Sequence, residues 1–181
     1  HTMAICNKAK KIVLEVNHRM PRCYGRDQAI HISQVDYIVE ADYPLPVVPS
    51  VKPTEIDRKV AAIIMEHLHD GCCLQLGIGG MPNAVGEMIA NSDLKDLGIH
   101  TEMFVDSMVD MVERGMVTGA KKNIDRYKIV AVFALGTQKN YDFINENPMC
   151  YFMPGSYTND PNVIGQLDNF VSINNCIDVD L

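Results

Sequence analysis

The sequence contains 181 residues, of which 47% are hydrophobic, and it carries a formal net charge of −7 at pH 7. This length and composition suit one globular domain, or one domain and part of another, with a substantial core. The negative charge argues against a nucleic-acid partner, which would need a basic face, although a local basic pocket for a phosphorylated ligand stays open. No stretch reaches the roughly 18 apolar residues of a membrane span, so we expect no membrane partner.

Residues 1–50 predict a first structural unit. Ala4–Lys10 has helical character and precedes a strand at Ile12–Val16, and the apolar stretch Ala29–Asp42 predicts a strand or an extended crossing segment. The run YPLPVVPSVKP, residues 43–53, holds four prolines. Because proline fixes φ and biases the preceding residue toward extended backbone, this run predicts an extended linker.

Helices and strands alternate after the linker. Thr54 is a predicted N-cap of a helix that ends at Gly71, and the helix carries apolar residues at helical spacing, namely Ile56, Val60, Ile63, Ile64 and Leu68. The later predicted strands are Cys72–Leu76, Ile99–Phe104, Lys128–Leu135, Met149–Met153 and Phe170–Val179. The later predicted helices are one with Pro82 in its first position, then Ser107–Arg114, Thr137–Asn145 and Pro161–Gln166. The alternation predicts an α/β fold with an open, mostly parallel sheet flanked by helices.

Both ends of the sequence interrupt a pattern. His1-Thr2-Met3 resembles a cloning scar, and the final strand-like run continues to the last residues. We therefore expect a fragment of a larger protein, with an incomplete domain. Residues 1–50 are predicted to end one domain and supply the linker, and residues 51–181 to begin the next.

The cysteines carry no disulfide or metal pattern, since none forms a C-x-x-C pair. This predicts reduced, mostly buried thiols in a cytoplasmic protein, and the first residues show no signal-peptide pattern. No cluster of ligand residues predicts a metal. The six are Cys6, Cys23, Cys72, Cys73, Cys150 and Cys176.

The stretch LQLGIGGMPNAV, residues 74–85, predicts a strand, a glycine corner and the first turn of a helix. Gly77, Gly79 and Gly80 allow a ligand to approach the backbone, and free N–H groups at a helix N-terminus favour an anion. Pro82 occupies the third glycine position of a dinucleotide fingerprint, and no G-K-[ST] follows, so neither standard nucleotide motif is present. A plain tight turn is the alternative.

Glu102 lies near the carboxyl end of the strand IHTEMF, on the same sheet edge as the glycine corner. Apolar neighbours at Ile99, Met103 and Phe104 predict partial desolvation of its carboxylate, which would favour a nucleophile or an acid of raised pKa. An ordinary surface glutamate is the alternative. His100 shares a strand face with Glu102, but a packed or solvated histidine is the simpler interpretation.

Asn159, in the loop PGSYTNDP, is a candidate for orienting a reacting carboxylate or carbonyl oxygen. An Asn-Asp-Pro turn explains it equally well. Asp106 is expected to cap the following helix rather than to react. No Ser, His and acid spacing predicts a catalytic triad.

Taken together, these stretches resemble the family I CoA-transferases. The motifs LQLGIGGMPNAV, LGIHTEMFVD, YDFINENP, YTNDP and VSINNCIDVDL, with EVNHRMPRCYG and IHISQVDYIVEADYPL upstream, are similar to the branch of 4-hydroxybutyrate, butyrate and acetate CoA-transferases and acetyl-CoA hydrolases. The resemblance covers nearly the whole chain from about Lys8. Gly80 and Met81 stand where Ala and Ile are common, and FVDS stands where FSDG is common.

The resemblance implies an acyl-CoA:carboxylate CoA-transferase, with coenzyme A as a substrate and no permanently bound cofactor. Glu102 matches the catalytic glutamate, which passes through an acyl anhydride to a glutamyl-CoA thioester. Gly77, Ile78, Gly79, Gly80 and Met81 match a segment that contacts CoA, and Asn159 matches an asparagine that positions the glutamate. The partners implied are an acyl-CoA and a short-chain carboxylic acid, and a homo-oligomer stays open.

The family also has a second glycine-rich loop, which is expected beyond Leu181, so we predict that this chain is inactive by itself. Three alternatives remain at this point. An acetyl-CoA hydrolase would use the same chemistry with water as the acceptor. A non-covalent nucleotide-binding α/β module, or a non-catalytic interaction domain, would give Glu102 no role.

Overall fold

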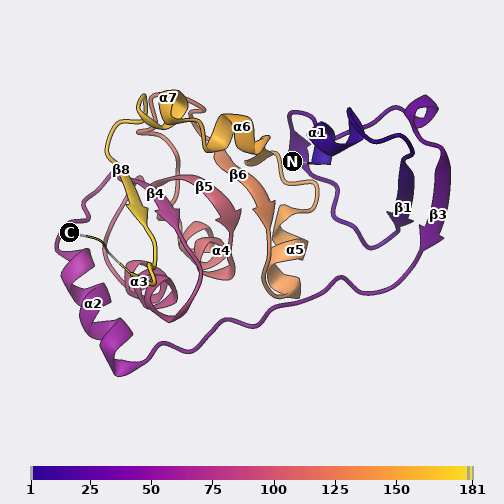
Figure 1. Ribbon diagram of the computed structural model, residues 1–181. Coiled ribbons are helices and arrows are strands. Elements are labelled where there is room, and N and C mark those ends of the chain that lie inside the picture. The colour runs from indigo at the N-terminus through magenta and orange to yellow at the C-terminus, as the bar shows by residue number, and fades with distance from the viewer. Residues whose placement is uncertain (1, 179, 181) are drawn as a thin grey trace.

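The computed structural model describes residues 2–178 and residue 180, and it shows a sheet surrounded by helices (Figure 1). A smaller, two-stranded parallel sheet lies beside it toward the N-terminus. Among the described residues, the strands of the large sheet pair in parallel. The expected α/β fold with a mostly parallel sheet is therefore confirmed.

The large sheet has six strands among the described residues, in the order β2-β7-β6-β5-β4-β8. Chain order runs from β4 to β7 across the sheet in one direction and then returns to place β8 on the other side of β4. The carboxyl ends of β4 and β8 therefore form a topological switch point, where open α/β sheets bind ligands. The strands are β2 (Tyr24–Gly25), β4 (Cys73–Leu76), β5 (Gly98–Phe104), β6 (Ile129–Ala134), β7 (Cys150–Phe152) and β8 (Phe170–Ile173).

Three helices connect the strands from β4 to β7, namely α3 (Gly80–Ala90), α4 (Asp106–Glu113) and α5 (Gln138–Ile144). Right-handed crossovers between neighbouring parallel strands put them on one face of the sheet. The short helix α6 (Gly155–Thr158) contacts β5 and β6, and α7 (Pro161–Ile164) follows it. Fully buried side chains of the core include Leu74, Leu76, Ile89, Ile99, Met108 and Met111.

Helix α2 (Glu55–Met65) begins where the sequence predicted. Thr54 Oγ1 accepts the N–H of Asp57 at 3.2 Å, while Asp57 Oδ2 accepts the N–H of Thr54 at 2.8 Å. This reciprocal pair satisfies donors that a helix N-terminus leaves free. The helix ends at Met65 rather than continuing to Gly71.

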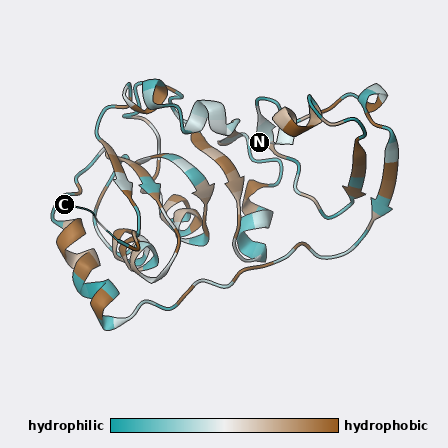
Figure 2. Ribbon diagram, viewed as in Figure 1, coloured by the Kyte–Doolittle hydropathy of each residue, from teal (hydrophilic) through white to brown (hydrophobic). Residues whose placement is uncertain are grey.

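The apolar positions of α2 divide between two faces. Ala61 is buried and Ile64 packs against the core, because this stripe faces α3. Ile56, Val60 and Ile63 also follow at helical spacing, but they are 73%, 39% and 60% exposed. Figure 2 shows hydrophobic and hydrophilic segments alternating along α2.

Several element boundaries also differ from the predictions. Helix α3 begins at Gly80, so Pro82 is its third residue, where its missing N–H still costs no helical hydrogen bond. The predicted loop after β7 contains α6. Helix α1 spans Thr2–Cys6 rather than Ala4–Lys10, β8 ends at Ile173, and Val179 of its predicted range lies outside the described residues.

Residues 2–53 contribute to both sheets. Strands β1 (Val13–Asn17) and β3 (Tyr37–Ala41) pair in the small sheet, and a 3-10 turn, η1 (Ile32–Gln34), interrupts the predicted extended segment before β3. Strand β2 lies in a predicted loop, yet it pairs with β7 at the edge of the large sheet. The proline-rich linker forms no helix or strand, as predicted, and the Val48 N–H donates to Gly136 O at 2.9 Å. None of the helices in the described ranges has the length and apolarity that crossing a bilayer requires.

Candidate active site

Glu102 lies on β5, two residues before the end of the strand, and its side chain opens into a cleft of about 750 Å³. One wall of the cleft comes from the N-terminal residues, including Leu14 and Arg26. The other comes from the carboxyl ends of the sheet strands, including Val132 and Met153. The carboxylate therefore lies between the N-terminal segment and the large sheet.

Glu102 is exposed to solvent in this structure, so the expected desolvation is wrong for the described chain. Ile99 and Met103 lie an odd number of residues from Glu102 along the strand. Their side chains therefore point to the other face and leave the carboxylate uncovered. Any desolvation of Glu102 has to come from a bound ligand or from additional polypeptide.

Asn159 is the C-cap residue of α6, and it contacts Glu102 directly. Its Nδ2 donates to Glu102 Oε2 at 2.8 Å, across 57 residues of sequence. A turn residue alone would not need this contact. The structure thus brings the two predicted site residues together and leaves Oε1 of the carboxylate free of Asn159.

His100 connects the same strand to the same helix. Its ring is 1% exposed, and Nε2 lies 2.8 Å from the carbonyl oxygen of Thr158. Because a carbonyl only accepts, Nε2 carries the proton. Burial lowers the pKa of His100, the Thr158 hydrogen bond opposes that change, and Nδ1 has no partner among the described residues.

Two further contacts hold α6 in place. Tyr157 donates its hydroxyl to Asp125 Oδ2 at 2.7 Å, and burial is the main cause that raises the pKa of Tyr157 to about 12. The guanidinium of Arg26 lies 5.1 Å from the centre of the Tyr157 ring. Sequence interpretation did not single out Arg26, because a lone arginine in a loop carries no spacing signal.

The glycine corner follows β4 at the switch point. Gly79 is the N-cap of α3 with φ of 119°, a conformation that favours glycine, and no side chain caps this helix. The free N–H groups and the helix dipole together favour an anionic group. Ile78 and Gly79 line a hollow of about 310 Å³ together with Met103, the residue after Glu102.

Two side chains of the protein lie close to the backbone of the glycine corner. A β-carbon at Gly80 would collide with Asp57 Oδ2, and one at Gly79 would lie 2.6 Å from Asn175 Nδ2. Asn175 Nδ2 also donates to Ile78 O at 3.1 Å. The capping carboxylate of α2 thus explains why glycine, rather than alanine, suits position 80 in this chain.

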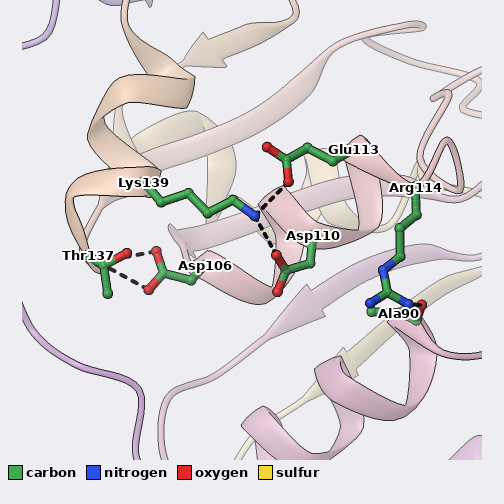
Figure 3. Close-up of polar contacts among 7 residues, drawn as sticks. All are labelled: Ala90, Asp106, Asp110, Glu113, Arg114, Thr137 and Lys139. Atoms are coloured by element: carbon green, nitrogen blue, oxygen red, sulfur yellow. Dashed lines mark hydrogen bonds and ion pairs between the residues drawn. The ribbon is translucent and has the colours of Figure 1, made fainter.

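Asp106 has a different role from the one predicted. It is the first residue of α4, with Val105 as the N-cap, and its carboxylate accepts the N–H of Thr137 at 3.1 and 3.2 Å. Figure 3 shows this contact beside the ion pairs of Lys139 with Asp110 and Glu113. Asp106 therefore joins α4 to the N-terminus of α5, and it is a structural residue.

The fold is that of an α/β protein, and its parallel sheet places a carboxylate, an amide donor and a glycine corner along its carboxyl edge, where open α/β sheets bind ligands. The N-terminal domain of the acetyl-CoA hydrolase/transferase family matches residues 1–49, and the C-terminal domain of that family matches residues 136–181. The chain belongs to the acetyl-CoA hydrolase/transferase family, as the resemblance predicted.

Its relatives include named CoA-transferases. The chain is 52% identical to the butyryl-CoA:acetate CoA-transferase of Anaerostipes caccae, with 100% of this chain and 41% of that protein covered. It is 52% identical to a probable butyrate:acetyl-CoA coenzyme A-transferase of Syntrophomonas wolfei, with 98% and 40% covered. The crystal structure of 4-hydroxybutyrate CoA-transferase from Porphyromonas gingivalis superposes with a TM-score of 0.90 at 39% identity, covering 98% of this chain and 45% of that one. The chain thus spans about 40% of the length of these curated relatives.

Proposed function

We propose that a protein of the relatives' length with this sequence is an acyl-CoA:carboxylate CoA-transferase, and that Glu102 is its nucleophile. The observation that carries the proposal is the hydrogen bond of Asn159 to Glu102 at the wall of the large cleft. Family membership and the names of the relatives support the same chemistry. The substrates are an acyl-CoA and a short-chain carboxylic acid, and coenzyme A enters as part of a substrate.

The reaction proceeds by covalent exchange at Glu102. Its carboxylate attacks the thioester carbonyl, the C–S bond breaks, and an acyl-glutamyl anhydride and CoA thiolate form. The thiolate then attacks the glutamyl carbonyl of the anhydride, releasing the first carboxylate and leaving a glutamyl-CoA thioester. A second carboxylate reverses both steps and leaves as the new acyl-CoA.

Asn159 holds the carboxylate for this attack. Its amide occupies Oε2, so Oε1 is presented to the cleft in a fixed orientation, which lowers the entropic cost of reaching the reactive geometry. Arg26 lines the same cleft beside Asp27, and its guanidinium is a group that can bind the carboxylate of a substrate.

The glycine corner, Gly77–Met81, is proposed to contact CoA. Its uncapped helix N-terminus suits the anionic groups of CoA, and the adjoining hollow is lined by apolar residues such as Val51 and Leu135. In the same proposal, residues 1–50 end an N-terminal domain and residues 51–181 begin the catalytic domain. The two family matches, at residues 1–49 and 136–181, support that division.

The test is to trap the glutamyl-CoA thioester. Protein of the relatives' length that contains these residues is mixed with butyryl-CoA, reduced with borohydride, digested and analysed by mass spectrometry. We expect the reduction mark on the peptide that contains Glu102. Glu102→Ala should lose the mark and lower kcat by at least about 10⁴-fold. Glu87→Ala, on the outer side of α3, should keep the mark and the wild-type kcat. A mark on another residue, or an active Glu102→Ala enzyme, would contradict the proposal.

Acetyl-CoA hydrolysis is the second candidate, because the matching family models describe hydrolases as well as transferases. An assay of CoA release with and without added acetate separates the two functions. A transferase accelerates only with the acceptor, whereas a hydrolase proceeds without it. The 181-residue chain alone is expected to transfer CoA far more slowly than the longer protein, since Glu102 is exposed to water in it.

A further inference from the structure

The contacts around α6 form a closed circuit with β5. His100 Nε2 donates to the carbonyl of Thr158, the next residue is Asn159, and Asn159 donates to Glu102, two residues after His100 on the strand. Both hydrogen bonds measure 2.8 Å. One end of the circuit fixes the backbone of α6, and the other end fixes the carboxylate.

The His100 end of this circuit is buried and packed on both sides. His100 pairs with Val130 in the middle of the sheet, and its ring is packed between Tyr157 and Phe170, with ring centres 6.4 and 6.1 Å away. The side chain is 1% exposed, so it reaches neither the cleft nor a ligand. A buried donor on a fixed strand is suited to setting the position of a helix end.

We propose that His100 is a positioning residue for the CoA-transferase reaction, and that its Nε2–H, by holding the Thr158 carbonyl, places the Asn159 amide against Glu102. The inference rests on the proposed function. His100 takes no direct part in proton transfer or in binding. Without its donor, the last turn of α6 keeps the Tyr157–Asp125 contact but loses the contact next to Asn159.

The test uses protein of the relatives' length and a double-mutant cycle. His100→Phe keeps an aromatic ring between Tyr157 and Phe170 but lacks the donor, and His100→Gln keeps a donor near the position of Nε2. We expect His100→Phe to lower kcat by roughly 10- to 100-fold, because it disturbs a hydrogen bond to a charged group, with KM for acyl-CoA changed less than about twofold. His100→Gln should recover most of the loss.

The cycle with Asn159→Ala separates positioning from a general loss of structure. If His100 acts through Asn159, His100→Phe lowers kcat in the wild-type background but adds little in the Asn159→Ala background. Tyr157→Phe is the matched control, since it removes the other anchor of α6, and its effect on kcat should be smaller. His100→Met replaces the phenylalanine variant should that variant fail to fold.

Two results would overturn the inference. The first is a wild-type kcat in His100→Phe. The second is a double variant, His100→Phe with Asn159→Ala, whose loss of kcat equals the product of the two single losses. If Glu102→Ala is inactive, either result contradicts only the role of His100 and leaves the proposed function standing. An active Glu102→Ala enzyme would instead remove the proposed function itself.

Discussion

Strands β5 and β3 have similarly apolar sequences but different surroundings. The first four residues of β5 are buried, whereas Tyr37, Ile38 and Val39 of β3 are 56%, 47% and 51% exposed. Strand β5 lies between β4 and β6 and contacts α6, while β3 pairs with β1 alone among the described residues. Figure 2 shows hydrophobic residues on both strands of the small sheet, β1 and β3. An apolar pattern therefore predicts a strand, but burial depends on the elements that cover it, and two strands cannot cover themselves.

The largest expected contrast is between Phe104 and Ile38. Phe104 is fully buried and stacks on Phe143 with ring centres 5.8 Å apart, so Phe104→Ala leaves a cavity. We expect it to lower the free energy of unfolding by about 3–5 kcal/mol. Ile38→Ala removes a half-exposed side chain and should cost less than about 1 kcal/mol. Urea unfolding of both variants measures the difference. Equal losses would mean that the β1–β3 sheet is buried in solution.

The second contrast is between two aspartates that each accept a backbone N–H. Asp106 accepts from Thr137 at a partly buried position, and Asp36 accepts from Ile12 at an exposed one. Asp106→Ala leaves the Thr137 N–H without its partner and should cost about 1–3 kcal/mol of unfolding free energy. Asp36→Ala should cost much less, because water replaces the carboxylate. If the Asp36 variant lost as much as the Asp106 variant, exposure would not distinguish the two regions.

The sequence was sufficient for the regular part of the fold, because short-range signals determine it. Thr54 as an N-cap and the alternation from β4 to β7 depend on residues a few positions apart. The same signals do not say which neighbour an element meets. Hence the exposed stripe of α2 and the pairing of β2 with β7 were not predicted.

The candidate site divides in the same way. Glu102 and the glycine corner follow from their positions at strand ends. For Asn159 the loop sequence offered an Asn-Asp-Pro turn as an equally good explanation, and the family resemblance decided between them. The 2.8 Å contact of Asn159 with Glu102 spans 57 residues, and no local pattern encodes such a distance. The hydrogen bond of His100 to a backbone carbonyl is still harder to foresee, because any residue at position 158 offers the same carbonyl oxygen.

Thiol labelling sharpens the comparison by measuring local opening. Cys73 and Cys150 are buried in the large sheet, and burial raises the pKa of Cys73 to about 11 and that of Cys150 to about 12. At pH 8 this lowers the thiolate fraction of Cys73 by about a hundredfold relative to a thiol with a pKa of 9.0. We expect Cys6, in the N-terminal region, to react with a thiol reagent much sooner, and mass spectrometry of timed samples identifies the order.

The same thiols predict the sign of an alkaline pH effect. Their pKa values are higher in the folded state, so the folded state binds more protons above pH 9, and the stability falls as pH rises toward 11. Cys73→Ala should flatten this slope. Early labelling of Cys73 or Cys150 would show that the sheet opens as readily as the N-terminal region. A stability that rises above pH 9 would contradict the raised pKa values of the two thiols.

The smallest contrast concerns the surface ion pairs of Lys139 and of Arg19. Lys139 Nζ lies 2.7 Å from Asp110 and 2.6 Å from Glu113 (Figure 3), and these hydrogen bonds raise its pKa. Lys139 is 43% exposed, so solvent screens the network, and Lys139→Ala should cost less than about 1 kcal/mol. Arg19→Ala, which breaks the single exposed pair with Asp42, should change stability by less than the error of a urea titration. Repeating both in 1 M salt should remove most of the Lys139 effect, since the Debye length falls to about 3 Å. A Lys139 effect that survives salt would instead mean that the aliphatic part of the Lys139 side chain stabilises the α4–α5 contact by packing, as the buried side chains of the large sheet do.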